Sequence, residues 1–198
     1  QRVQIKVLIF LLFYGYKFLG VIAMDEIELL LPSLEFEQEI MNYKNEYPYN
    51  PNGIEGTSML AFKNSITDWL DYLKIHENRK TVPDNRVPAI QYIVVKKSDH
   101  SIVGMLNLRL ELNDYLLNYA GHIGYSVKPS ERKKGYGSKM LGLALAKSKI
   151  LGLNKILVTC ADDNLGSIGV IENNNGVLED KRLDPDDGKL TRRYWISL

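Results

Sequence analysis

The segment Gly121–Leu151 constrains the fold of this chain more than any other part of it. Apolar residues alternate with small or polar ones over 123–127, which predicts a half-buried strand. Pro129 cannot donate to a strand ladder, so the strand should end before it. From Met140 to Leu151 the apolar residues recur at helical spacing, and Gly152 suits the end of a helix. The segment therefore predicts a strand, a turn and a helix.

The turn between this strand and this helix is basic and contains two glycines. It reads Arg-Lys-Lys-Gly-Tyr-Gly-Ser over 132–138. The first amides of a helix have no intrahelical partner and lie at the positive end of its dipole, so they suit a phosphate group. No phosphate-loop motif occurs, and Met140 occupies the third glycine position of a dinucleotide-binding motif. The sequence predicts a small phosphate-bearing ligand of another kind.

The turn resembles a family signature. The hexapeptide Arg132–Gly137 is similar to the R/Q-x-x-G-x-G/A motif of the GCN5-related N-acetyltransferases (GNAT). In that family the loop amides hold the pyrophosphate of acetyl-CoA. The resemblance implies that the cofactor is bound by Arg132, Lys133, Lys134, Gly135, Tyr136, Gly137 and Ser138. The alternative is an ordinary turn between a strand and a helix, with solvated lysines.

The resemblance extends over most of the chain, from Met24 to the C-terminus. It is similar to the bacterial "predicted acetyltransferase" branch in the stretches 109–113, 115–118, 121–135 and 193–196. It therefore implies one GNAT domain over 24–198, with the α+β fold of the acyl-CoA N-acyltransferases.

The order of the expected elements agrees with that fold. Turn residues and apolar periodicity predict the order β-α-α-β-β-β-α-β-α-β-β. This order implies a mixed, mostly antiparallel sheet with helices on both faces. The second helix is expected over Ser58–Ile75, and the strand before the central one over Ile102–Leu112. Tyr47, Tyr49 and Trp69 are expected either to line an acceptor pocket or to pack in the core.

Composition limits the classes of partner. The chain has 198 residues, enough for one domain, and a net charge of +1, which gives no argument for nucleic acid. Cys160 is the only cysteine, which is compatible with a reducing, cytoplasmic location. The histidines are scattered and no Cys/His cluster has metal-ligand spacing, so no metal is expected.

Residues 1–23 are unusual, because a continuous apolar run lies between Lys6 and Lys17. A short membrane span and a signal peptide are both conceivable. Met24-Asp25-Glu26 resembles a natural start, so a non-native or extra leader is favoured over an anchor.

The resemblance also assigns roles around the expected strand. It implies that Tyr125, Ser126 and Val127 bind the pantetheine arm and the thioester oxygen through backbone amides, which stabilises a developing oxyanion. It implies that Asn164 and Ser167 contact the pantetheine arm and the adenosine side.

Acylation also needs a base, because an amine with a pKa of about 10 is protonated at neutral pH. Glu111, near the end of the strand before the central one, is the first candidate. The alternatives are a solvated carboxylate at the strand end and an ion-pair partner for Arg109. His122 is a second candidate, although a histidine in a strand is more often structural. Tyr194 could contact the acceptor.

The chain departs from the family at Ile171, where many members carry a tyrosine that protonates the leaving thiolate. Tyr194 or Tyr125 could replace it, or the thiolate could leave unassisted. The branch usually has glycine at the position of Asn175, and this second departure should have no structural effect.

The sequence predicts an acetyl-CoA-dependent N-acetyltransferase. It would act by direct attack in a ternary complex on a primary amine of an unidentified small molecule or peptide. A non-catalytic acyl-CoA-binding sensor is the alternative, and an unrelated phosphate-binding domain is a third. A homodimer is the default assembly, and a membrane is not expected as a partner.

Overall fold

The computed structural model describes residues 25–186 and 188–198, so the expected leader 1–23 lies outside the described residues. The strands are β1 (Ile27–Leu30), β2 (Ala89–Lys96), β3 (Ile102–Arg109), β4 (Ile123–Val127), β5 (Lys155–Ala161), β6 (Val177–Leu183) and β7 (Leu190–Ser197). The α-helices are α2 (Glu37–Asn45), α3 (Ile66–His76), α4 (Tyr136–Ile150) and α5 (Leu165–Glu172). This order confirms the predicted sequence of elements.

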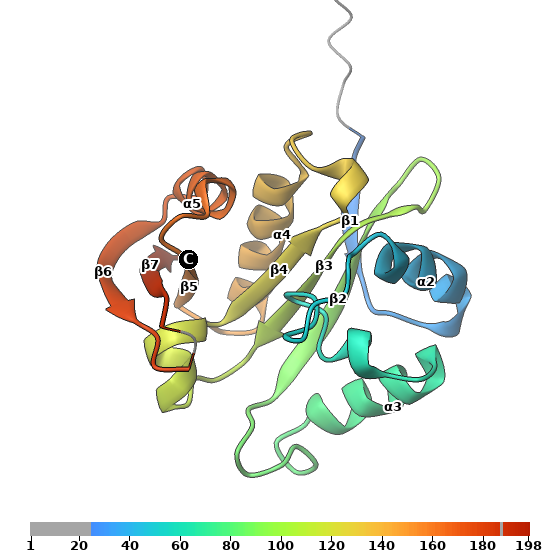
Figure 1. The fold of residues 1–198 in the computed structure, drawn as a ribbon, viewed down its shortest axis with the longest axis horizontal. Helices are drawn as coiled ribbons and strands as arrows, with labels where there is room; N and C mark the ends of the chain where they lie inside the picture. Colours follow the sequence, from blue (N-terminus) through green and yellow to red (C-terminus); the bar gives the residue numbers. More distant parts are fainter. Residues whose placement is uncertain (1–24, 187) are drawn as a thin grey trace, which may run out of the picture.

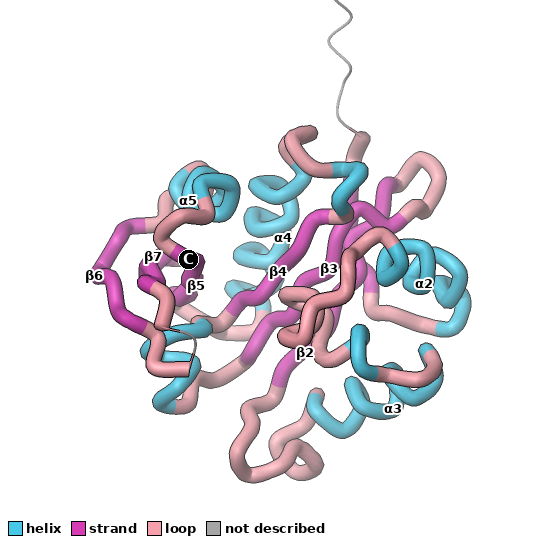
Figure 2. Tube along the Cα trace, in the orientation of Figure 1, coloured by secondary structure: helices cyan, strands magenta, loops and turns pink. Residues whose placement is uncertain are grey.

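The strands form two antiparallel sheets that lie side by side (Figure 1). The first has the order β1-β2-β3-β4 and the second the order β5-β7-β6. Helix α4 packs against β1 and β3, whereas α2 and α3 contact β3 and β2. Figure 2 shows α4 on one side of the first sheet and α2 and α3 on the other. The prediction of helices on both faces is therefore confirmed.

The two sheets meet where β4 and β5 begin to run together. The His122 amide donates to the Leu157 carbonyl at 2.8 Å, and the Leu157 amide donates to His122 Nδ1 at 2.9 Å. Gly121 has a φ of +64°, and a Cβ there would lie 2.5 Å from the Leu157 oxygen, so only glycine fits this close approach. Beyond this point β4 and β5 form no ladder and belong to different sheets.

Buried apolar side chains hold the layers together. One cluster lies between α4, α5 and the strands β2, β3, β4, β5 and β7, and includes Leu106, Leu141 and Ile156. A second lies under α2 and α3 and includes Trp69, whose indole donates to the Thr57 carbonyl at 2.9 Å. Of the two roles expected for Trp69, acceptor pocket or core, the structure shows the core.

Two predicted boundaries were wrong. The second helix begins at Ile66, capped by Ser65, and not at Ser58, because Ser58 and Met59 have positive φ values that a helix does not allow. The strand expected over Ile102–Leu112 ends at Arg109, so Glu111 lies beyond it. None of the described helices is both long and apolar enough to cross a membrane.

Candidate active site

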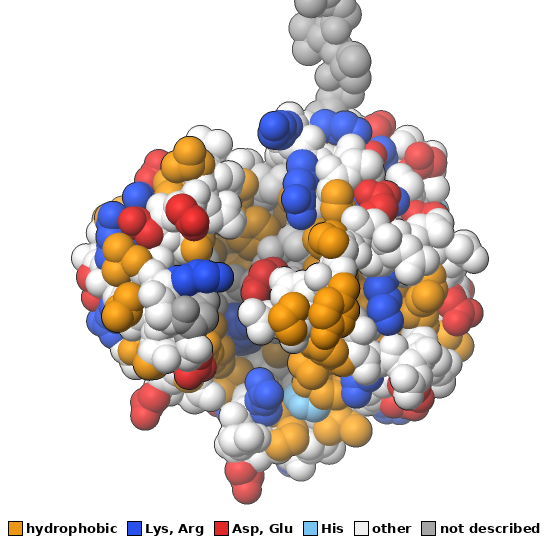
Figure 3. Space-filling model, in the orientation of Figure 1, with side chains coloured by type: hydrophobic (Ala, Val, Ile, Leu, Met, Phe, Trp, Pro, Cys, Tyr) orange, Lys and Arg blue, Asp and Glu red, His pale blue; other side chains and the backbone are white. Residues whose placement is uncertain are grey.

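A cavity of about 620 Å³ lies between β4 and the N-terminal parts of α4 and α5; we call it the cofactor cavity. The face of the molecule in Figure 3 is hollowed between the part that carries α5 and β6 and the part that carries α2 and α3. Every predicted cofactor residue except Lys134 lines this cavity. The loop 50–55 and Tyr47 form the opposite wall.

The N-terminus of α4 opens into the cofactor cavity. Gly135 is its N-cap, with a φ of +86° and no side chain to cap the first amides. Gly137 packs closely on α5, because a Cβ there would lie 2.9 Å from Val170 Cγ2. Uncapped amides at the start of a 15-residue helix suit an anionic ligand. The local geometry thus fits a diphosphate.

The cations of the loop before α4 differ in their contacts. Lys134 donates to Glu131 at 3.0 Å and points away from the cavity wall. Arg132 donates through Nε to the Val127 carbonyl at 3.2 Å, and it stacks on Tyr47 with its guanidinium carbon 5.7 Å from the ring centroid. Lys133 and Arg132 form no ion pair within the described chain. Two of the three predicted cations, Arg132 and Lys133, therefore line the cofactor cavity, whereas Lys134 does not.

The edge of β4 that faces the cofactor cavity has backbone groups without a strand partner. The Lys128 amide donates to Val103 of β3, and backbone groups of successive strand residues point to opposite edges. Val127 and Tyr125 therefore face the cavity, and Tyr47 Oη donates to the Val127 carbonyl at 2.7 Å. The backbone groups of Ser126 point toward β3 instead, although the residue lines the cavity. Its hydroxyl lies 2.8 Å from Tyr43 Oη and donates to the Glu55 carbonyl, so it holds the loop above β4.

Tyr125 places a phenol between β4 and α5. Its hydroxyl is buried and has no hydrogen-bond partner among the described residues. Burial raises the pKa of Tyr125 to about 12, and the nearby Ser167 hydroxyl partly offsets this rise. Asn164 caps α5 by accepting from the Ser167 amide at 3.0 Å. An orphaned buried hydroxyl in a cavity wall is a donor that a bound ligand could satisfy.

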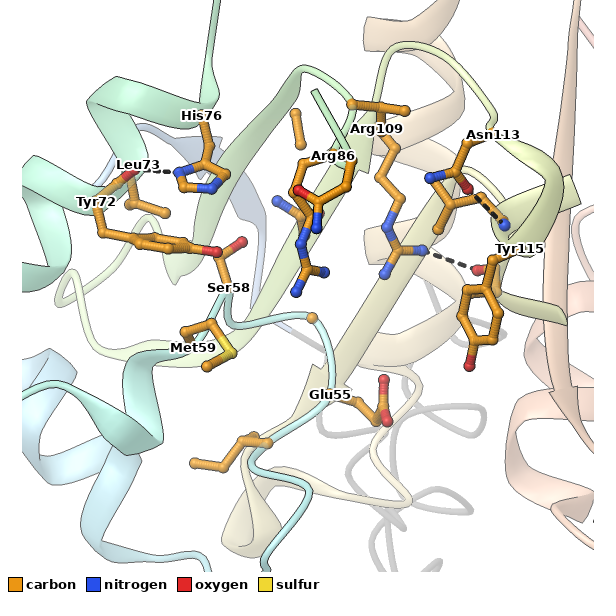
Figure 4. Close-up of a pocket in the computed structure, with 18 of the residues that line it drawn as sticks. Glu55, Ser58, Met59, Tyr72, Leu73, His76, Arg86, Arg109, Asn113 and Tyr115 are labelled. Atoms are coloured by element: carbon orange, nitrogen blue, oxygen red, sulfur yellow. Dashed lines mark hydrogen bonds between the residues drawn. The ribbon is translucent and has the colours of Figure 1, made fainter. Parts of the chain in front are cut away.

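A second cavity, of about 540 Å³, lies on the α3 side of β4; we call it the acceptor cavity (Figure 4). Its wall includes Glu55, Arg86 and Arg109, together with Tyr72 and Tyr115. Figure 4 shows both guanidinium groups directed into this space, with the Glu55 carboxylate on the other side of it. Glu55 lines both cavities, so it lies where they meet.

The backbone around Glu55 is held firmly on β4. Gly56 has a φ of +70°, and a Cβ there would lie 2.5 Å from the Tyr125 Cα. The buried Gln91 side chain donates to the Gly56 carbonyl at 2.8 Å and accepts from Ser58 Oγ at 2.8 Å. The Glu55 carboxylate is therefore carried over the centre of β4 by a fixed backbone, as a catalytic group requires.

The predicted acid and base candidates lie elsewhere. Glu111 is half-exposed, pairs with Arg79 and does not line either cavity. Tyr194 is 1% exposed, and its hydroxyl contacts Glu172 at 3.2 Å and Arg192 at 3.3 Å. Ile171, at the family's tyrosine position, is fully buried in the core.

His122 is a structural residue of the seam between the sheets. It is 7% exposed, and its Nδ1 accepts from the Leu157 amide. Burial, with a smaller effect of the Arg109 charge, lowers the pKa of His122 to about 4. The ring is therefore neutral at neutral pH, in line with the structural alternative.

Sequence reasoning missed Glu55. It lies in a loop rich in Asn, Pro and Gly that carries no motif and no periodicity. The one local signal is the pair Glu55-Gly56, a carboxylate next to a residue that tolerates close backbone approach. Within the described ranges, no group of three His, Cys, Asp or Glu side chains could hold a metal ion.

Comparisons with known proteins agree with this geometry. Residues 59–176 match the family model described as "Acetyltransferase (GNAT) family". A chimera of the spermidine N-acetyltransferase SpeG from Vibrio cholerae and hSSAT is similar in structure, with 18% identity, a TM-score of 0.59 and coverage of 86% of this chain and 95% of that one. A protein provisionally assigned as a ribosomal-protein-serine acetyltransferase from Vibrio cholerae has 14% identity, a TM-score of 0.59 and coverage of 87% and 94%.

A dodecameric structure of the Vibrio cholerae spermidine N-acetyltransferase has 18% identity, a TM-score of 0.56 and coverage of 88% and 94%. These identities support the shared fold alone. No curated protein sequence matches the chain significantly.

Proposed function

This chain belongs to the acetyltransferase (GNAT) family, and we propose from this premise that it transfers the acetyl group of acetyl-CoA to a primary amine in a ternary complex. One observation carries the proposal. The uncapped start of α4, the open edge of β4 and the Glu55 carboxylate border one continuous site. Acetyl-CoA supplies the activated acetyl thioester when it is bound.

The cofactor cavity has the parts that this cosubstrate needs. The amides that begin α4, with Arg132 and Lys133, would hold the pyrophosphate. The backbone amides of Tyr125 and Val127 point to the open edge of β4, where they would donate to the thioester oxygen. Donors fixed in this way stabilise a developing negative charge without reorganisation.

Glu55 is our proposed general base in place of Glu111. It lies between the two cavities, whereas Glu111 lies outside both and is paired with Arg79. Glu55 would take a proton from the acceptor ammonium, directly or through a water. Glu111 remains a prediction that the geometry does not favour.

Tyr125 is our proposed donor to the departing sulfur, in place of the tyrosine that is absent at Ile171. With its pKa raised to about 12, the phenol keeps its proton at neutral pH and can donate a hydrogen bond. Tyr194 stays a prediction for contact with the acceptor, although its hydroxyl is buried against Glu172 and Arg192.

The experiment is incubation with acetyl-CoA and a panel of primary amines, with thiol release as the readout. Release that depends on both substrates, with the acetylated amine identified by mass spectrometry, is the expected result. The fully buried Ile171 favours one alternative, a sensor that binds acyl-CoA without turnover. Thermal stabilisation by coenzyme A without thiol release from any amine would support that sensor and contradict the enzyme.

A homodimer stays a prediction. Strand β6 is the outer strand of its sheet and exposes Leu178 and Leu183, and such edges often pair with other chains. Sedimentation velocity would measure the assembly. A cytoplasmic location likewise stays a prediction, based on a single cysteine.

A further inference from the structure

The acceptor cavity contains an arginine that is fixed in place but has no anionic partner. Arg109 ends β3, and its Nη1 donates to the carbonyls of Ala120 at 2.8 Å and Gly121 at 3.0 Å. Within the described ranges no carboxylate lies within ion-pair distance of its guanidinium. Its side chain is therefore oriented by neutral backbone groups, and its charge is left to interact with whatever occupies the cavity.

Burial makes that charge costly. Burial lowers the pKa of Arg109, and the nearby Glu55 charge partly offsets this effect. A guanidinium nevertheless stays protonated in proteins. An anion that binds next to a partly dehydrated cation without an ion pair therefore gains more electrostatic binding energy than it would at the open surface.

A second guanidinium comes from a different segment. Arg86 lies in the loop before β2 and also lines the acceptor cavity, and no ion pair forms at it among the residues described. Figure 4 shows Arg86 and Arg109 directed into the same space. Two cations from separate segments thus converge on one wall.

The remaining charged residues of the cavity are acidic. Glu55 lies at the junction with the cofactor cavity, and Asp186 lines the acceptor cavity from the loop between β6 and β7. The cavity is therefore polarised, with a carboxylate where the amine must react and guanidinium groups further away.

We propose that the acceptor is a primary amine that also carries a carboxylate, an inference that rests on the proposed function. The ammonium group would face Glu55, and the carboxylate would lie against Arg109 and Arg86, whose planar forks match a carboxylate. A diamine of the same length would place its second cation against two guanidinium groups and is disfavoured.

The transfer leaves the carboxylate unchanged. The nitrogen forms a bond to the acetyl carbon while the carbon–sulfur bond of the thioester breaks. Of the two protons that the ammonium loses, one passes to Glu55 and the other reaches the leaving sulfur. The products are the N-acetylated carboxylate and coenzyme A thiol.

The test compares three acceptors of equal chain length: an ω-amino carboxylate, its primary amide and the corresponding diamine. Steady-state thiol release would give kcat/KM for each, over several chain lengths. We expect kcat/KM for the amino carboxylate to exceed that for the amide by about 10- to 100-fold, which corresponds to one or two charge-assisted hydrogen bonds. The difference between the amino carboxylate and the diamine should be larger.

Arg86→Ala is the informative variant, because Arg86 is exposed and its side chain forms no hydrogen bond or ion pair with the residues that the structure describes. It should reduce kcat/KM for the carboxylate about 10-fold and change that for the amide little. Lys80→Ala removes an exposed cation from the same connection outside the cavity and should leave all three values unchanged. Binding of coenzyme A checks that each variant is folded.

Each outcome decides the inference separately from the proposed function. If the amide or the diamine reacts as well as the carboxylate, the inference is wrong while acetyl transfer stands. If none of the amines is acetylated, the inference is tested by calorimetry, which measures binding of the amino carboxylate to the protein saturated with coenzyme A. Binding that Arg86→Ala weakens about 10-fold supports the carboxylate site; absent or unchanged binding contradicts it.

Discussion

The two cavities meet at Glu55 but are built in different ways. The cofactor cavity takes most of one wall from a continuous segment, 125–138, in which a strand leads into a helix. The acceptor cavity collects single residues from α3, from the loop before β2, from the end of β3 and from the loop 54–59. The first surface is therefore set by local geometry, and the second by how separate segments pack.

The largest effect should come from the carboxylate at the junction. Glu55→Gln removes the base but keeps the size and a hydrogen-bonding side chain, so kcat should fall by about 10²- to 10⁴-fold. Affinity for coenzyme A should change little, because Glu55 only borders the cofactor cavity. Thiol-release kinetics and calorimetry would measure the two quantities.

Glu111→Gln is the matched control, because Glu111 is half-exposed and lies outside both cavities. It should change kcat less than about twofold, as surface substitutions seldom have larger effects. The reverse result, a severe loss in Glu111→Gln and a mild one in Glu55→Gln, would restore the base predicted from the sequence.

The difference between the cavities explains what could be predicted from the sequence. The turn 132–138 and its flanking elements are contiguous, so the sequence could predict an anion-binding turn with two glycines and three cations. Of these cations, Arg132 and Lys133 line the cofactor cavity and Lys134 does not. Glu111 is predicted as the base because the apolar pattern of the strand continues through Leu112. The strand instead ends at Arg109, whose amide donates to the His122 carbonyl. Glu55 could not be predicted, because its position depends on contacts of Gly56 and Gln91 with distant strands.

The second prediction tests the contiguous segment by itself. Gly135 and Gly152 lie at opposite ends of α4 and have φ values of +86° and +87°. Alanine at either position has the same backbone strain, about 1 kcal/mol. Only Gly135→Ala should also disturb the amides that face the cofactor cavity, so it should weaken coenzyme A binding by about 30- to 100-fold at an equal Tm loss. Equal affinities in the two variants would mean that the start of α4 does not hold the ligand.

The third prediction concerns His122 at the seam where the two sheets meet. The pKa of His122 is about 4 in the folded chain, below the unfolded value of about 6.5, so the unfolded state binds the proton first. The contribution of His122 is fully present above pH 6.5 and is lost as the pH falls toward 4, up to about 3 kcal/mol.

His122→Asn keeps an acceptor for the Leu157 amide and removes the titration. Urea unfolding at several pH values should give a shallower loss of stability for this variant between pH 6.5 and 4. Identical pH profiles for the variant and the wild type would show that His122 does not couple the seam to pH.

The fourth prediction concerns the Tyr125 phenol between β4 and α5. Tyr125→Phe should lower kcat by about 10-fold, since it removes one donor to the departing sulfur and keeps the ring packing. Stability should not fall, because the hydroxyl has no hydrogen-bond partner among the described residues and its loss leaves no other group unsatisfied. A slower enzyme of unchanged Tm is the expected combination. An unchanged kcat would indicate that the thiolate departs without help from Tyr125.

The smallest expected effect is a difference in coenzyme A affinity between variants of two neighbouring cations, Lys133 and Lys134. Lys133 lines the cofactor cavity with a φ of +61°, whereas Lys134 pairs with Glu131 and lies outside it. Lys133→Ala should weaken coenzyme A binding by about threefold to tenfold, more at low salt, because one charge near the phosphates is lost. Lys134→Ala should change binding less than about twofold, since Lys134 lies outside the cofactor cavity and Glu131 keeps its ion pair with Lys96. If the two variants lose affinity equally, the loop acts through its summed charge, and the distinction between a shaped cofactor wall and a merely basic one disappears.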